Sequence, residues 1–293
     1  MAIAMSIATS IATGDGLWLA IAHHRLPAPR ARVVLVHGYA EHHARYTQFV
    51  ERLETENIEC VRFDLRGHGT SGGPRAFVAR FENYLDDLDR VLTTIDRTVP
   101  LFLFGHSLGG LITLEYVRTR RATCDAFAVS SPYLAPAFRI ARIQVLLAGA
   151  LSRFAPRIEL ASGLNPKWVS RDAEVVAAYA SDPRIFRTTT PRWFTEIRAA
   201  QRRLFARARE ITTPALFLVA GADRIADPRV AAAVFDRIGT ADKQRIVYPE
   251  LYHELLNELP EARAAVVHDF STWLSGRLAR TLQASDSSGG MHE

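Results

Sequence analysis

Residues 100–110, with the sequence PLFLFGHSLGG, decide the fold of this chain. An apolar run, residues 101–104, leads into a glycine-x-serine-x-glycine pattern centred on Ser107, and a helical stretch begins at Leu108. This order predicts a buried strand, a sharp turn and a helix. Such a turn strains the backbone of the central serine and crowds its flanks, so glycine is favoured on either side. It also places the Ser107 hydroxyl at a helix N-terminus, where N–H groups favour developing negative charge. We therefore predict that Ser107 is a nucleophile.

The flanking chain alternates between strand-like and helix-like segments. Apolar, strand-like runs occur at residues 32–38, 58–63, 125–132, 214–223 and 243–250, and helical stretches separate most of them. Near the N-terminus, alternating residues on both sides of Gly14-Asp15-Gly16 predict a hairpin. The β-α order predicts an α/β fold with a mostly parallel central sheet flanked by helices.

The alternation is interrupted between residues 137 and 208. This stretch reads as helical and contains no convincing buried strand, with prolines at positions 156, 166, 183 and 191. We expect a core formed by residues 1–134 and 210–282, with a helical cap inserted at residues 135–209. The small, polar residues 283–293 predict a disordered tail.

A serine hydroxyl needs a base to become a nucleophile, so one of the ten histidines should serve it. His253 follows the last strand-like run and precedes a helix. Asp223 ends the run before it and is the expected acid, with Asp227 as the alternative. The chain order serine, acid, histidine is the one expected for this strand–turn–helix architecture. The backbone N–H groups of Leu108 and Tyr39 are the expected oxyanion donors.

Composition excludes several other classes of protein. The chain has 293 residues, 48% of them hydrophobic, which favours one large α/β domain with an insertion. Two cysteines exclude a disulfide framework and a cysteine-rich zinc site. The net charge is +5, but the basic residues are spread along the chain and no nucleic-acid-binding motif is present. The glycine-rich residues 67–73 lack the G-K-[ST] ending of a phosphate-binding loop. We expect no metal, no organic cofactor and no nucleic-acid partner.

The cellular location follows from the absence of targeting signals. No apolar run approaches the ~18 residues of a membrane-spanning helix. The N-terminus lacks the basic start of a secretory signal, so a cytoplasmic protein is expected. In the cap, a run of mostly apolar residues is flanked by Arg139, Arg142, Arg153 and Arg157. That pattern suits either a helix packed over the pocket or peripheral contact with anionic lipid.

Five segments of the sequence together resemble one family: HGYAEHHARY, FDLRGHGTSGG, GHSLGG, GADRIAD and YHELLNE. They are similar to the monoacylglycerol lipase and lysophospholipase branch of the α/β-hydrolases, which is also classed with serine aminopeptidase-like hydrolases. The resemblance covers about residues 14–278. It implies an α/β-hydrolase fold with a helical cap, and a serine hydrolase that cleaves carboxylic esters of lipid-like substrates without a cofactor.

The resemblance also assigns roles to individual residues. It implies that Ser107, Asp223 and His253 are nucleophile, acid and base, and that the Tyr39 and Leu108 amides form the oxyanion hole. Glu41 and Arg45 match positions on the alcohol side of the pocket, and His106 stands beside the nucleophile. Glu41 and Arg45 could equally belong to a buried polar network that braces their loop.

Three other functions are compatible with the same residues. The chain could be a short-chain carboxylesterase, an acyltransferase that uses an alcohol in place of water, or a ligand-binding protein that keeps the hydrolase fold. Position 39 is tyrosine where some relatives carry a small residue, and the cap matches the family least. Both features bear on the choice of substrate, and the sequence does not indicate the acyl length, the head group or the oligomeric state.

Overall fold

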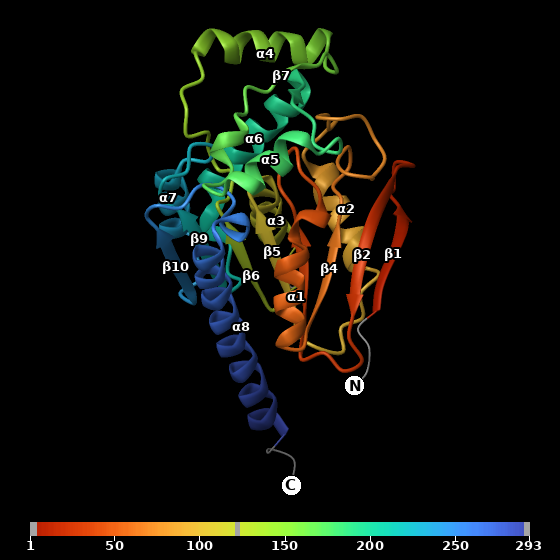
Figure 1. The fold of residues 1–293 in the computed structure, drawn as a ribbon, viewed down its shortest axis with the longest axis vertical. Coiled ribbons are helices and arrows are strands. Elements are labelled where there is room, and N and C mark those ends of the chain that lie inside the picture. The colour runs from red at the N-terminus through yellow and green to blue at the C-terminus, as the bar shows by residue number, and fades with distance from the viewer. Residues whose placement is uncertain (1–4, 121–123, 290–293) are drawn as a thin grey trace.

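The computed structural model describes residues 5–120 and 124–289 of the chain (Figure 1). Within them, the central sheet has eight strands in the order β1-β2-β4-β3-β5-β6-β9-β10. The strands are β1 (Met5–Ala12), β2 (Trp18–Arg25), β3 (Ala31–Val36), β4 (Ile58–Phe63), β5 (Leu101–His106), β6 (Ala126–Ser130), β9 (Ala215–Ala220) and β10 (Lys243–Tyr248).

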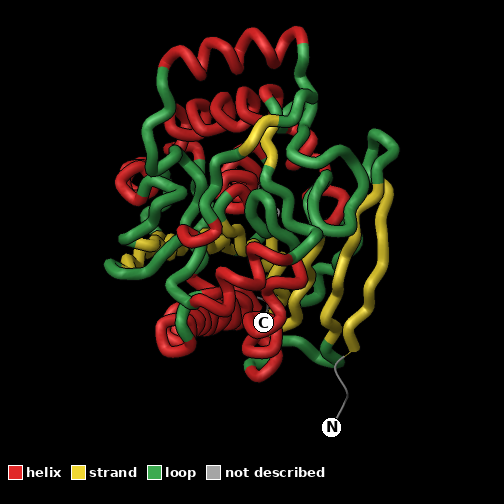
Figure 2. Tube along the Cα trace, turned by 45° about the horizontal axis from the view of Figure 1, so that its top comes forward, coloured by secondary structure: helices red, strands yellow, loops and turns green. Residues whose placement is uncertain are grey.

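The strand directions confirm the predicted fold class. Strands β4, β3, β5, β6, β9 and β10 run parallel to one another. Strands β1 and β2 form the predicted antiparallel hairpin at one edge, seen as the pair of long strands in Figure 2. Every residue of β3, β4, β5, β6 and β9 is buried, as expected for parallel strands covered on both faces.

Helices cover both faces of the sheet (Figure 1). One face packs against α1 (Thr47–Thr55) and α8 (Pro260–Gly289). The other packs against α2 (Glu82–Leu92), α3 (Leu108–Thr119) and α7 (Pro228–Arg237). The expected tail from residue 283 overlaps the last residues of α8 as far as Gly289, and residues 290–293 lie outside the described part of the chain.

The chain between β6 and β9 forms a separate group of elements over the carboxyl ends of the parallel strands (Figures 1 and 2). We call residues 135–209 the inserted segment. It contains α4 (Arg142–Phe154), β7 (Leu160–Ala161), α5 (Ala173–Ser181), β8 (Thr188–Thr189) and α6 (Pro191–Arg207). The two-residue antiparallel pair β7–β8 in this stretch is not buried, so it does not conflict with the expectation that the stretch contains no buried strand. Short 3₁₀ helices lie at His43–Tyr46, Pro166–Trp168, Ala208–Glu210 and Leu255–Asn257.

The turn between β5 and α3 is as tight as the sequence predicts. Ser107 has φ 52° and ψ −114°, a strained conformation for a residue with a side chain. A Cβ atom at Gly109 would collide with the backbone oxygen of Val36 and lie 2.6 Å from that of His37. One at Gly105 would collide with the Gly109 backbone. These two glycines therefore allow α3 to begin directly against β3 and β5.

Substitution of Gly109 by alanine tests this packing. We expect Gly109→Ala to lower the free energy of unfolding by about 3 kcal/mol, because the obstacle is backbone that cannot move away. Gly149→Ala is the matched control. Gly149 lies inside α4, nothing lies within 4 Å of its added Cβ, and alanine should stabilise the helix by roughly 0.5–1 kcal/mol. Denaturant unfolding of both variants measures the difference, and equal effects would contradict the steric argument.

Candidate active site

Three loops at the carboxyl ends of parallel strands bring the predicted reactive residues together. Ser107 follows β5, Asp223 follows β9 and His253 follows β10. Since β5, β6, β9 and β10 are neighbours in the sheet, their ends meet at one edge. This is the position at which open α/β sheets bind ligands.

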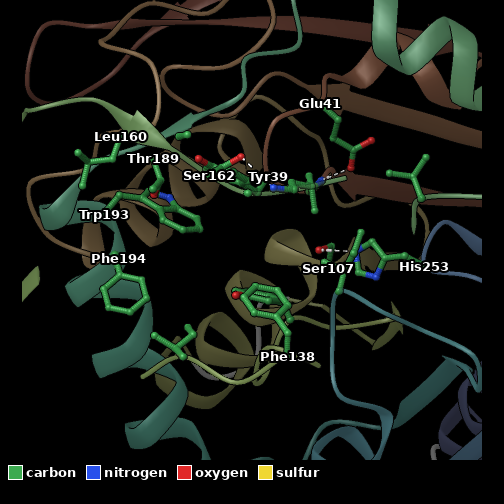
Figure 3. A pocket seen from close by; sticks show the side chains of 18 of the residues that line it. Tyr39, Glu41, Ser107, Phe138, Leu160, Ser162, Thr189, Trp193, Phe194 and His253 are labelled. Atoms are coloured by element: carbon green, nitrogen blue, oxygen red, sulfur yellow. Dashed lines mark hydrogen bonds between the residues drawn. The ribbon is translucent and has the colours of Figure 1, made fainter. Parts of the chain in front are cut away.

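A chain of hydrogen bonds joins these three residues. The Ser107 hydroxyl lies 2.8 Å from His253 Nε2, and His253 Nδ1 lies 2.7 Å from Asp223 Oδ2 (Figure 3). Because an ionised carboxylate only accepts, Nδ1 carries the proton and Nε2 is free to accept from the serine. The second Asp223 oxygen accepts the backbone N–H groups of Ile225 and Ala226 at 2.7 and 3.0 Å, which fixes the carboxylate. This arrangement can remove the proton of Ser107.

The alternative acid, Asp227, has a different structural role. Its side chain accepts from the Arg229 backbone N–H at the start of α7, and it forms an ion pair with the Arg229 guanidinium. It therefore caps a helix. The hydrogen bonds to His253 come from Asp223.

The surroundings of His253 favour its protonated form. Burial alone would lower the pKa of this imidazole, but the Asp223 carboxylate outweighs burial and raises it. The nearby Glu254 and Glu41 act in the same direction. The arrangement stabilises an imidazolium once His253 has accepted a proton.

The loop after β3 runs against the nucleophile. A Cβ atom at Gly38 would lie 3.0 Å from the Ser107 Cβ and 3.2 Å from the His106 ring. Tyr39 follows directly, while Leu108 is the first residue of α3, where N–H groups lack partners within the helix. The two expected oxyanion donors thus flank Ser107. Their role in catalysis stays a prediction.

A buried cluster of charges lies beside this loop. Arg45 forms two hydrogen bonds with Glu254, at 2.5 and 2.7 Å, and one with Glu41 at 3.2 Å. Glu41 also accepts from the Gly38 backbone N–H and, at 2.8 Å, from the Tyr46 hydroxyl. Glu41 and His106 line the cavity described below, whereas Arg45 is not part of its lining and pairs with Glu41 and Glu254.

The two carboxylates of this cluster differ in their proton affinity. Burial raises the pKa of Glu41 to about 7, with Arg45 opposing the effect and Glu254 adding to it. Glu254 is equally buried, but its bidentate contact with Arg45 lowers its pKa. Burial and the charge of His253 lower the pKa of His106 to about 3, so that this ring is neutral. Its centroid lies 4.9 Å from that of His253.

A cavity of about 460 Å³ opens in front of Ser107. At one end lie Ser107 and His253, with the carboxylate of Glu41 nearby; Trp193, Phe194 and Leu160 line the other end (Figure 3). The inserted segment supplies most of the apolar wall. The cavity can hold a molecule with a polar group beside the serine and an apolar tail.

Sequence reasoning missed some of these residues. It gave Trp193 and Phe194 no place in the pocket, yet both line the cavity, and Trp193 is buried in the core as well. It gave no role to Glu254, which binds Arg45 and lines the cavity. The position of Glu254 directly after His253, in H-E-L, is the signal that could have indicated it. Among the residues that the structure describes, no group of three or more His, Cys, Asp or Glu side chains could hold a metal ion.

The fold and the strained serine turn define an α/β-hydrolase. Residues 27–260 match the family described as serine aminopeptidase, S33, and the chain belongs to this family. A monoacylglycerol lipase from Mycolicibacterium smegmatis is 33% identical over 255 residues, which cover 85% of this chain and 90% of the relative. A phospholipase from Bacillus subtilis is 29% identical over 78% of this chain and 90% of its own length.

A solved structure agrees with the relatives found by sequence. The crystal structure of a monoacylglycerol lipase from Paleococcus ferrophilus superposes with a TM-score of 0.81 at 31% identity. The match covers 89% of this chain and 99% of that one. No helix in the described part of the chain is long and apolar enough to cross a bilayer.

The raised pKa of His253 predicts how the cleavage of an ester by Ser107 depends on pH. The base must be neutral to accept the serine proton, so kcat/KM should rise with pH through the pKa of His253 and then level off. That acid limb should lie above the ordinary value of about 6.5. Measurement of kcat/KM from pH 5 to 9 with an activated ester tests this, and a limb clearly below that value would contradict it.

Asp223→Asn should lower the limb and reduce kcat by roughly 10⁴-fold.

Proposed function

We propose that this chain is a serine hydrolase that cleaves carboxylic esters of lipid-like substrates, such as monoacylglycerols or lysophospholipids. The observation that carries the proposal is the hydrogen-bonded series Ser107, His253 and Asp223 at one end of a cavity with an apolar wall. The names of the three relatives described above support the same class of substrate.

The reaction proceeds through an acyl-enzyme. The Ser107 oxygen attacks the ester carbonyl while His253 Nε2 takes its proton, and the Tyr39 and Leu108 amides bind the oxyanion. The bond from carbon to the alcohol oxygen then breaks, and the alcohol leaves with the proton from His253. Water then attacks the acyl carbon while His253 Nε2 takes its proton. The bond from this carbon to the Ser107 oxygen breaks, His253 returns the proton to Ser107, and the fatty acid leaves. Asp223 orients the imidazole and stabilises its charge.

The two ends of the cavity suit the two parts of such a substrate. The acyl chain would lie along Leu160, Trp193 and Phe194, and the alcohol would face Glu41, Glu254 and His106. With a pKa of about 7, Glu41 can donate to or accept from an alcohol hydroxyl near neutral pH.

We further propose that the inserted segment is a cap that brings the enzyme to anionic lipid surfaces. Helix α4 contacts α6, where Ser152 pairs with Thr195 at 2.9 Å, and its outer side chains are exposed. Leu146 is 69% exposed and Phe154 82%. Four exposed arginines flank these apolar side chains: Arg139, Arg142, Arg153 and Arg157. An apolar face edged by cations suits an anionic interface.

Hydrolysis of a graded ester series tests the proposed activity. Wild type should cleave esters from short-chain forms to long-chain monoacylglycerols, and Ser107→Ala should lose at least about 10⁴-fold in kcat, because no other group forms the acyl-enzyme. Ser271→Ala, which changes a buried serine of α8, should retain wild-type rates.

The series also separates the alternatives. Activity confined to short esters would keep Ser107 as nucleophile but overturn the lipid assignment. A transesterified product in the presence of added alcohols would indicate an acyltransferase. If wild type and Ser107→Ala are equally inert, the proposed hydrolysis is wrong.

Vesicle sedimentation tests the contact with lipid. Wild type should bind vesicles that contain phosphatidylglycerol more strongly than vesicles of phosphatidylcholine alone, and added salt should weaken the binding. Replacement of both Leu146 and Leu147 by serine should weaken it roughly tenfold or more, because less apolar surface is buried in the lipid. Val247→Ser is the control, since Val247 is 48% exposed on β10, outside the inserted segment. Equal binding by wild type and the double variant would contradict the proposal.

A further inference from the structure

The side chain of Tyr39 leaves the core and enters the inserted segment. Its hydroxyl donates to the backbone oxygen of Thr188 in β8. Burial raises the pKa of this phenol well above its usual range, so the hydroxyl keeps its proton and stays a donor. The residue expected to supply an oxyanion N–H through its backbone is therefore attached, through its side chain, to another part of the protein.

Aromatic contacts hold the Tyr39 ring on two further sides. Its centroid lies 4.2 Å from the Trp193 ring in α6 and 5.2 Å from that of Phe186, to which it is perpendicular. The Trp193 indole N–H donates in turn to the Tyr84 hydroxyl of α2 at 3.2 Å. The ring thus has little room to move unless the inserted segment moves with it.

A second contact ties the same loop to the same segment. His42 Nε2 lies 3.0 Å from an Asp182 oxygen at the end of α5. The guanidinium of Arg184 holds this carboxylate in place, with a distance of 2.6 Å. The loop after β3 is therefore attached to the inserted segment at residues 39 and 42.

The backbone between these attachment points is also constrained. Ala40 has φ 54°, in the left-handed region that disfavours residues with side chains. Glu41 folds back to accept the N–H of Gly38. A movement of the Tyr39 or His42 side chain should therefore displace the Tyr39 N–H, because the backbone between them is not flexible.

We propose that Tyr39 is a positioning residue whose hydroxyl contact with Thr188 couples the inserted segment to the oxyanion hole. This inference rests on the proposed function, since it assumes that the Tyr39 N–H binds an oxyanion. Strand β8, which accepts the hydroxyl, pairs with β7, and both strands line the cavity. A substrate that fills the cavity would therefore contact the strand pair whose Thr188 oxygen accepts the Tyr39 hydroxyl.

The proposed coupling predicts a different kinetic effect from that of a tyrosine that only stabilises the fold or shapes the cavity wall. The oxyanion forms with every ester, whereas the cavity wall matters only for long acyl chains. Loss of the hydroxyl should therefore lower kcat for short and long esters alike and leave KM unchanged. A tyrosine that only shapes the wall would change KM for long chains and spare short ones.

The test compares wild type, Tyr39→Phe and Tyr248→Phe. Tyr39→Phe keeps the ring and removes the bond to Thr188. Tyr248→Phe also removes a phenol hydroxyl bond, the one to Asp269 at 2.8 Å, but in β10 and outside the cavity lining. For each variant, kcat and KM are measured across the ester series, together with the rate constant for phosphonylation of Ser107 by a fluorophosphonate. Thermal unfolding shows whether each variant is folded.

We expect Tyr39→Phe to lose roughly tenfold in kcat at every chain length, the effect of a small displacement of a catalytic group. Phosphonylation, which also develops negative charge on an oxygen in the oxyanion hole, should slow by a similar factor. Tyr248→Phe should match wild type in both measurements.

The outcomes distinguish this inference from the proposed function. If wild type is active and Tyr39→Phe keeps its kcat on short esters, or shows only a KM change on long ones, the coupling is wrong and the proposed function stands. If wild type cleaves no ester but is phosphonylated, the ester function is wrong and the phosphonylation rates still test the coupling. A wild type inert in both assays overturns both proposals.

Discussion

The close approach of α3 to β3 is the contact on which the rest of the site depends. Gly109, in the first turn of α3, lies against the backbone oxygens of Val36 and His37. Because the helix begins so close to the sheet, the chain must turn sharply at Ser107, and the turn directs the hydroxyl toward His253. The same approach places the end of β3 beside the nucleophile. The loop that begins at Gly38 therefore starts in contact with Ser107.

The carboxylates around His253 raise its pKa because water is excluded from the site. Asp223, Glu41 and Glu254 are all buried, so the attraction between each carboxylate and the imidazolium is screened little by solvent. One cation, Arg45, serves two of these carboxylates, and its better geometry toward Glu254 leaves Glu41 closer to neutral. The cluster thus keeps one firmly ionised carboxylate near the base and one that can change its protonation near neutral pH.

The sequence predicted the parts of the structure that depend on local rules. The glycines around Ser107 and the buried strands follow from steric and burial constraints that act over a few residues, and the structure has both. A local rule also favoured Asp223, which ends the strand-like run, over Asp227, which lies four residues further along the chain. The structure separates them by their partners, a histidine for one and a helix N-terminus for the other. The pairing of Arg45 with Glu254 joins residues 209 positions apart and has no local signal.

The cavity wall was the hardest part to predict, because its residues come from strands and helices and follow no single hydrophobic periodicity in the sequence. Leu160 and Thr189 come from two-residue strands, too short to show an alternating pattern, while Trp193 and Phe194 belong to a helical stripe that is also part of the core. Leu160 and Thr189 lie outside the hydrophobic core clusters, whereas Trp193 packs in the core. The apolar wall of the cavity and the hydrogen-bonded Ser107, His253 and Asp223 therefore come largely from different parts of the chain. The loop at Tyr39 is a point at which the two parts touch, because its backbone faces Ser107 and its ring faces Trp193.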